Sequence, residues 1–192
     1  NVVQMFAQQA EEKNLEIACF VEENVPRGCI GDANRIGQVL INLIGNALKF
    51  TSEVDVIVRV RLESEMDDQV VIHFEIADTG IGIATEKIDH IFEHFMQEDS
   101  STTRRFGGSG LGLSISRQLL GLMGGKIRVE STLGVGSTFS FTIPFAKVAA
   151  ADAPKPLTGI RGLRALVVDD HEINREIICY ELKNWGFITG EA

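Results

Sequence analysis

The sequence predicts an α+β domain built as a two-layer α/β sandwich, with helices on one face of a mixed, mostly antiparallel sheet. Three observations support this fold class. Two pairs of β-branched segments are each joined by a short turn, which is the pattern of β-hairpins. Segments of helical periodicity lie before, between and after these segments. Hydrophobic residues make up 44% of the 192 positions, which is enough for a packed core.

The first elements follow from local patterns. Residues 1–13 have spaced apolar positions and are predicted to end a preceding helix, and residues 15–21 alternate as a strand does. Asp32 is a favourable N-cap for a helix that runs to about Lys49. This helix has an apolar stripe formed by Ile36, Val39, Leu40, Leu43, Ile44 and Ala47.

The middle of the chain predicts two hairpins with helices between them. Residues 54–62 and 70–77 are β-branched runs separated by an acidic turn, and residues 126–132 and 137–145 flank a glycine-containing turn. Between the hairpins, the sequence predicts a short helix over 85–91, a polar glycine-rich loop over 96–110 and a helix over 111–123.

The C-terminal part has a different composition. Residues 147–162 are small, aperiodic and contain proline, so they are predicted to be a linker. An apolar strand over 163–168 and a helix over 172–185 follow. This last unit is below the size of about 40 residues that usually folds alone. The predicted organisation is therefore a helix end (1–13), a main domain (14–146), a linker (147–162) and a partial second domain (163–192).

Charge and cysteine content exclude some classes. The net charge is −9 and no block of Lys or Arg occurs, so a nucleic-acid partner is not expected. Cys19, Cys29 and Cys179 are far apart and form no C-x-x-C pair, which suits a reducing compartment. No apolar run approaches the length of about 20 residues that spans a membrane.

The first candidate site is a polar face on the helix after Asp32. Asn42 and Asn46 are one helical turn apart, so their amides point the same way, and Lys49 follows closely. Amide oxygens are hard ligands suited to Mg²⁺, which prefers few protein ligands together with phosphates and water. The same amides could instead cap backbone groups or face water.

A second candidate is the segment 78–83, Asp-Thr-Gly-Ile-Gly-Ile, at the end of a predicted strand. The Asp78 carboxylate could accept a charge-assisted hydrogen bond from an amino group such as that of adenine. Gly80 and Gly82 would let the backbone approach a flat ring closely. By itself this pattern could equally be a strand-to-helix turn with an Asp cap.

A third candidate is the glycine-rich segment 107–113, which opens a predicted helix. Free backbone N–H groups and the positive end of the helix would face a bound anion there. Arg104 and Arg105 precede it and could contact phosphate. The segment is not a Walker A loop, because no Gly-Lys-Ser/Thr follows, and a glycine-rich loop alone is often structural.

Together, the three segments resemble the ATP-binding boxes of sensor histidine kinases. Residues 42–51 resemble the N box, 78–83 the first glycine box, 92–95 the F box and 108–112 the second glycine box, in the same order and spacing. The resemblance covers residues 1–146 and implies the GHKL fold with a Bergerat-type ATP pocket.

The resemblance also implies roles for individual residues. Asn46 would be the main Mg²⁺ ligand, helped by Asn42, and Lys49 would meet phosphate. Asp78 would read the adenine amino group, with Phe50 packed near the ring. Residues 96–110 would form the ATP lid, with Phe92 and Phe95 at its base. The remaining expected nucleotide contacts are Gly80, Gly82, Ile83, Arg104, Arg105, Gly108, Ser109, Gly110, Leu111, Gly112 and Thr138.

The family needs a phospho-accepting His on a dimerising helix hairpin, and no His here has the matching context. His171-Glu172-Ile173 copies the start of that box, but Asn174-Arg175 follows instead of a Thr-Pro ending. The strand before it ends in Asp169 and Asp170, which resembles the opening of a receiver domain. We therefore expect no catalytic residue of certain role in this chain, with the accepting His and the receiver's Asp both outside it.

The sequence thus predicts the ATP-binding catalytic domain of a hybrid sensor histidine kinase, with ATP and Mg²⁺ as cofactors. Its expected partners are the dimerisation helices and receiver domain of a homodimeric, membrane-anchored parent, whose cytoplasmic portion this would be. The chain alone is expected to be a monomer. Two alternatives stay open: a GHKL ATPase of the chaperone or mismatch-repair kind, and a regulatory module that no longer uses ATP.

Overall fold

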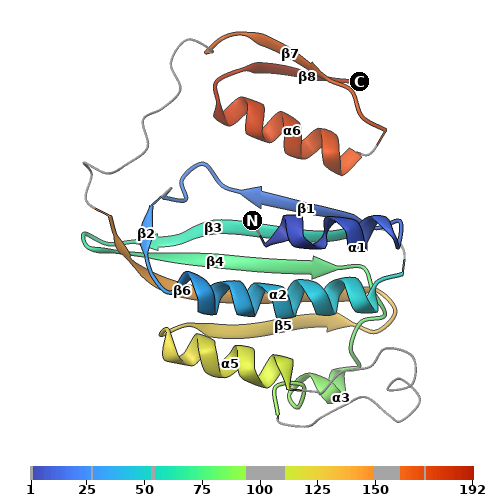
Figure 1. The fold of residues 1–192 in the computed structure, drawn as a ribbon, viewed down its shortest axis with the longest axis vertical. Helices are drawn as coiled ribbons and strands as arrows, with labels where there is room; N and C mark the ends of the chain where they lie inside the picture. Colours follow the sequence, from blue (N-terminus) through green and yellow to red (C-terminus); the bar gives the residue numbers. More distant parts are fainter. Residues whose placement is uncertain (1, 27, 53–54, 94–110, 149–160, 171) are drawn as a thin grey trace.

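The computed structural model describes residues 2–26, 28–52, 55–93, 111–148, 161–170 and 172–192. A six-stranded sheet and a helical layer on one of its faces form the main body, and a small two-stranded sheet follows (Figure 1). The main sheet contains β1 (Glu16–Val21), β2 (Cys29–Ile30), β3 (Asp55–Glu65), β4 (Gln69–Asp78), β5 (Lys126–Thr132) and β6 (Gly136–Lys147). The helices of this body are η1 (Val3–Phe6), α1 (Ala7–Glu11), α2 (Ala33–Phe50), α3 (Thr85–Ile88) and α5 (Gly112–Leu122). The C-terminal elements are β7 (Arg164–Val167), α6 (Glu172–Asn184) and β8 (Ile188–Glu191).

The sheet is mixed and mostly antiparallel, as predicted. Its strand order is β1-β3-β4-β6-β2, with β5 also paired to β6. Both predicted hairpins are present, because β3 pairs antiparallel with β4, and β5 with β6. β1 runs parallel to β3 and forms an edge of the sheet. β4 and β6 therefore lie in the interior of the sheet, where both sides are paired.

Alternation along the central strands defines a face that packs on the helices. Phe74 of β4 stacks on Phe141 of β6, with ring centroids 4.8 Å apart and planes 11° apart. α2 faces this layer with its predicted apolar stripe, of which Val39, Leu43, Ile44 and Ala47 are buried and Ile36 and Leu40 are partly buried. The buried residues of these elements include Val39, Leu43, Ile44, Ala47, Leu48, Val56, Val58, Ile72, Ile76, Leu120, Phe139 and Ile143.

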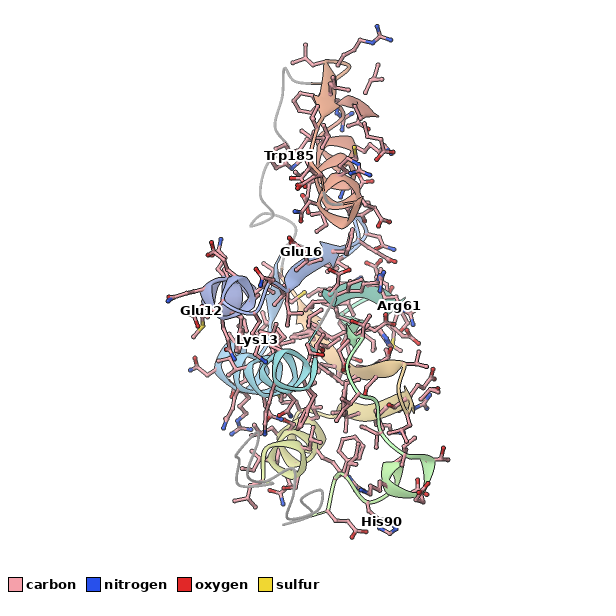
Figure 2. The ribbon with its side chains drawn as sticks, turned by 90° about the vertical axis from the view of Figure 1, so that its right-hand side faces the viewer. Glu12, Lys13, Glu16, Arg61, His90 and Trp185 are labelled. Carbon is pink, nitrogen blue, oxygen red and sulfur yellow. The ribbon has the colours of Figure 1, made fainter. Side chains whose placement is uncertain are left out.

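Both ends of α2 are held by specific hydrogen bonds. At its start, the Asp32 side chain accepts from the backbone N–H of Arg35 at 3.0 Å, which confirms the predicted N-cap. At its end, the last carbonyls of a helix lack partners within the helix. The Lys13 ammonium donates to the carbonyl of Leu48 at 2.6 Å, and Figure 2 shows Lys13 between α1 and α2. The N-terminal segment is thus tied to the end of α2.

Several details differ from the sequence-based expectation. The N-terminal segment begins as the 3₁₀ turn η1 before α1, and α3 ends at Ile88 rather than at residue 91. β2 and β8 were not predicted, because each is short and is defined by its pairing, β2 with β6 and β8 with β7. The predicted loop 96–110 lies outside the described residues, as do residues 149–160 of the predicted linker.

Candidate nucleotide-binding site

The polar face of α2 has two asparagines with different surroundings. The Asn42 amide donates to the hydroxyl of Ser116 on α5 at 3.0 Å, so this side chain is held between the two helices. Among the described residues, the side chain of Asn46 has no hydrogen-bond partner. Both side chains are partly buried. Asn42 therefore joins α2 to α5.

The start of α5 lies directly against this face. A Cβ atom added at Gly112 would overlap the side-chain oxygen of Asn42, and would lie 2.8 Å from its Cγ. A larger residue at this position would therefore displace the Asn42 side chain from its place between α2 and α5. This contact places the last part of the predicted second glycine box next to the N box.

The C-terminal end of α2 lies against the loop after β4. The carbonyl of Phe50 accepts from the backbone N–H of Ile81 at 3.3 Å. A Cβ atom at Gly80 would lie only 2.6 Å from this carbonyl, so the loop passes close to the helix end. Lys49 Nζ lies 4.8 Å from the centroid of the Phe50 ring. α2 is thus the common neighbour of both glycine-rich segments.

Asp78 ends β4 and lies at the base of this arrangement. Its carboxylate accepts from the backbone N–H of Gly80 at 2.9 Å. Burial raises the pKa of Asp78 above its ordinary value, and the backbone N–H groups of Gly80 and Ser137 oppose this shift. A partly buried carboxylate that keeps some acceptor capacity suits a donor supplied by a ligand.

The glycine loop is supported from the β5–β6 turn. Gly82 has a φ of +67°, and a Cβ there would overlap the Thr132 carbonyl, so both conformation and space require glycine. The Ile83 backbone N–H donates to the Ser131 hydroxyl at 2.7 Å. That hydroxyl also donates to the Gly136 carbonyl at 2.8 Å and lies 3.0 Å from the Ser137 hydroxyl. The loop position is therefore set by the second hairpin.

The register of β4 and β6 separates Thr138 from Asp78. Ser137 pairs with Asp78, whereas Thr138 pairs with Ala77. Because side chains alternate between the faces of a strand, Ser137 shares the face of Asp78 and Thr138 points to the other face. Thr138 was expected to contact the nucleotide, and this register places it away from that face. Ser137 was not among the expected contacts, and its buried place on the Asp78 face follows the alternation of Ser137, Phe139 and Phe141 with the polar residues between them.

Some of the other expected site residues lie in the described part of the chain and others do not. Phe92 packs edge-on against Phe139, with ring centroids 6.5 Å apart, so it joins the edge of the hydrophobic core. Leu111 directly precedes α5. Within the described ranges there is no cluster of three or more His, Cys, Asp or Glu side chains that could hold a metal. Phe95, Arg104, Arg105, Gly108, Ser109 and Gly110 lie outside the described residues.

Known proteins match this chain in sequence and in structure. Residues 31–147 match the family described as histidine kinase-, DNA gyrase B- and HSP90-like ATPase. Hybrid signal transduction histidine kinase B of Dictyostelium discoideum is 45% identical over 75% of this chain. Sensor histidine kinase GacS of Pseudomonas protegens is 39% identical over 95% of it.

Two solved structures extend these matches. Full-length ShkA in complex with AMPPNP superposes with a TM-score of 0.78 and 33% identity, and the match covers 100% of this chain and 38% of ShkA. The catalytic domain of the histidine kinase ThkA gives a TM-score of 0.58 and 30% identity, covering 74% of this chain and 88% of that domain.

A mixed sheet with helices on one face, and an asparagine-bearing helix beside two glycine-rich segments, define the class of ATP-binding α/β sandwich domains. The chain belongs to the histidine kinase-, DNA gyrase B- and HSP90-like ATPase family. Within that family it carries the catalytic, ATP-binding domain of a sensor histidine kinase. The chain spans 7% of the Dictyostelium relative and 20% of GacS. No helix in the described ranges is long and apolar enough to cross a membrane.

Proposed function

We propose that the domain binds Mg²⁺-ATP between α2, the loop after β4 and the start of α5. It would donate the γ-phosphate to a histidine on a dimerisation hairpin. The observation that carries this proposal is the position of α2. Its Asn42 meets Gly112, and its Phe50 carbonyl meets Gly80 and Ile81. Three segments that are far apart in the sequence therefore meet around one polar helix face.

Asn46 is the proposed principal Mg²⁺ ligand, with Asn42 in a secondary role. Mg²⁺ is bound in many phosphate sites by few protein oxygens together with phosphates and water, so an amide pair fits its chemistry. The Asn42 amide nitrogen is already committed to Ser116, which leaves its oxygen on the side of Gly112. A bound Mg²⁺ would neutralise charge on the phosphates. Lys49, in the last turn of α2, would add a cation beside them.

Asp78 is the proposed adenine-recognition residue. Its carboxylate would accept a hydrogen bond from the exocyclic amino group, and the backbone N–H groups of Gly80 and Ser137 hold it in place. Ser137 shares the face of Asp78 and is a further proposed contact at the adenine end. Phe50 would pack near the ring. Phosphoryl transfer needs little covalent chemistry from such a domain, because positioning and charge neutralisation supply most of the effect.

We further propose that residues 163–192 begin a receiver domain, so that the parent is a homodimeric hybrid kinase with this domain in the cytoplasm. The parallel pairing of β7 with β8, connected through α6, is the βαβ arrangement such a domain requires. Asp169 follows β7, and its carbonyl accepts from Arg175 at 2.7 Å. One relative is named a hybrid signal transduction histidine kinase, and the match to GacS extends over 95% of this chain.

The proposal is tested by calorimetry and by phosphotransfer. Residues 1–192 should bind a non-hydrolysable ATP analogue more tightly with Mg²⁺ than with EDTA. A purified histidine-bearing hairpin of a sensor kinase, supplied with labelled ATP, should acquire phosphate that depends on this chain. Absence of binding heat at micromolar protein would favour a regulatory module without nucleotide, and steady ATP turnover without labelled hairpin would favour an ATPase.

A further inference from the structure

The edge strand β1 is covered by a helix from outside the ATP-binding domain. β1 has β3 as its strand neighbour in the sheet, so its other side is an edge. α6 lies along this side, with the β7–β8 pair beyond it (Figure 1). Ala18 in β1 is only 1% exposed. Because uncovered edge strands can pair with other chains, proteins often cover them with a helix.

Tyr180 makes the specific contacts at this junction. Its hydroxyl accepts from the backbone N–H of Glu23 at 3.1 Å, just beyond the end of β1. Its ring meets Phe20 edge-on, with centroids 6.3 Å apart and planes at 71°. The guanidinium of Arg59 lies 5.7 Å from the same Phe20 ring. Phe20 is thus contacted by α6 and by β3, and Tyr180 has both a polar and an aromatic partner on the other unit.

A cleft of about 220 Å³ lies beside these contacts. It is lined from the ATP-binding domain and from α6 by Phe20, Glu22, Arg59, Val60, Arg61, Glu75, Glu176 and Tyr180. Arg59 Nη1 lies 3.4 Å from Glu75 Oε1, so these two opposite charges of the sheet are paired within the cleft. Figure 2 shows Arg61 on the sheet beneath the C-terminal unit. The cleft marks the part of the junction that is not closely packed, which leaves Tyr180 as its best-defined contact.

A second observation, on Cys19 in β1, also connects β1 with α6. The pKa of the Cys19 thiol in β1 is raised by burial and, to a lesser extent, by the Glu181 carboxylate of α6. The charge of Glu181 on α6 therefore acts on the Cys19 thiol in β1. Ile178, two positions before Tyr180, is 43% exposed and lies on another face of α6. Tyr180 is therefore the residue of α6 with direct contacts to the β1 region, and Glu181 acts on Cys19 through its charge.

We propose that the Tyr180 face of α6 and the β1 edge form an internal docking surface. Through it, the β7–α6–β8 segment is held at a fixed place on the ATP-binding domain, with Tyr180 as the anchor. Its partner is this same chain, and its consequence is that the edge of β1 is closed to other strands. This inference concerns the placement of the segment and does not depend on the nucleotide chemistry proposed above.

Amide hydrogen exchange resolved to single residues by NMR tests the proposal in residues 1–192. Tyr180→Ala should raise exchange over residues 16–23 by about tenfold, because local opening of the edge is then easier. Tyr180→Phe should raise it only at the amide of Glu23, which loses its acceptor. Ile178→Ala, on the exposed face, should match the wild type. Equal exchange over residues 16–23 in the wild type and Tyr180→Ala would overturn the proposal.

Cys19 supplies an independent measurement. Its alkylation rate at mildly alkaline pH, located by mass spectrometry, should rise in Tyr180→Ala, because displacing α6 removes the Glu181 carboxylate that raises the thiol pKa. Glu181→Gln should also raise the rate by lowering the thiol pKa, without altering exchange over residues 16–23. Tyr180→Ala could loosen the whole domain, in which case exchange would also rise over β4. The Tyr180→Phe variant then tests whether Tyr180 is the anchor. An unchanged exchange rate at the Glu23 amide in that variant would overturn the anchor role.

Discussion

Asp78 and Ser137 face each other across the pairing of β4 with β6, and the backbone N–H of Ser137 supports the Asp78 carboxylate. This relationship puts an acidic group at the end of a strand that is paired on both sides. The group is held by backbone donors, which do not depend on side-chain rotamers. A ligand that binds Asp78 would therefore meet an acceptor whose position is already set.

Replacing Asp78 should separate adenine recognition from stability. Asp78→Asn exchanges one acceptor oxygen for a donor, so ADP affinity should fall by about ten- to a hundredfold, the range expected for a hydrogen bond to a charged group. The affinity for inorganic triphosphate should change little. Calorimetric titration with the two ligands measures both effects, and equal losses for both would argue against an adenine-specific role.

The raised pKa of Asp78 also predicts a pH dependence. Since the folded form holds this proton more tightly than the unfolded form, the group favours the folded state at low pH, and this contribution is lost as pH rises. The loss runs from the ordinary value of 3.8 up through the folded pKa. The free energy of unfolding of the wild type, minus that of Asp78→Asn, should therefore decrease with rising pH across this window. Urea unfolding without nucleotide measures it.

The two asparagines of α2 should respond differently to alanine. Asn46→Ala should remove the part of nucleotide affinity that depends on Mg²⁺, about tenfold or more, because a ligand to the ion is lost. Asn42→Ala should in addition lower the free energy of unfolding by about 1–3 kcal/mol, since the buried Ser116 hydroxyl loses its hydrogen-bond partner. Calorimetry with Mg²⁺ and with EDTA, combined with urea unfolding, distinguishes the two. Unchanged Mg²⁺ dependence in Asn46→Ala would refute its assignment.

Two glycines in α5 provide a matched pair. Gly112→Ala introduces a methyl group against the Asn42 side chain and should destabilise the fold by about 1–3 kcal/mol. Gly121→Ala, in the same helix with no neighbour within 4 Å of the new Cβ, should instead stabilise it by up to about 1 kcal/mol. Thermal unfolding of both variants tests the close approach of α5 to α2. Similar effects of the two substitutions would contradict it.

His73, on the face of β4 away from the helices, predicts a loss of stability in acid. Burial and the nearby Arg61 lower its pKa, and the carboxylates of Glu63 and Glu75 oppose the shift. The unfolded chain therefore takes up a proton first, so His73 lowers stability as pH falls through its ordinary value of 6.5. His73→Gln should reduce this loss. Chemical unfolding at several pH values between neutrality and mild acid measures the difference.

The fold class, both hairpins and the long helix could be predicted from the sequence because each has a strong local signal. Asp32 before an apolar stripe is such a signal, and the structure confirms that cap. β2 and β8 could not be predicted, because Cys29–Ile30 and Ile188–Glu191 become strands only through distant partners. Ser137 and Thr138 show the same limit at the site. Both are small polar residues, and only the register with β4 decides which of them faces Asp78.

The bond between Lys13 and the Leu48 carbonyl has a mechanical consequence. Leu48 is only two residues beyond Asn46, so the ammonium of the N-terminal segment holds the stretch of α2 that the proposed metal ligand occupies. A displacement of residues 7–13 must either break this bond or carry the end of α2 with it. The Lys13 bond and the packing of Phe6 and Ala10 in the core therefore couple the position of this segment to the end of α2, close to Asn46.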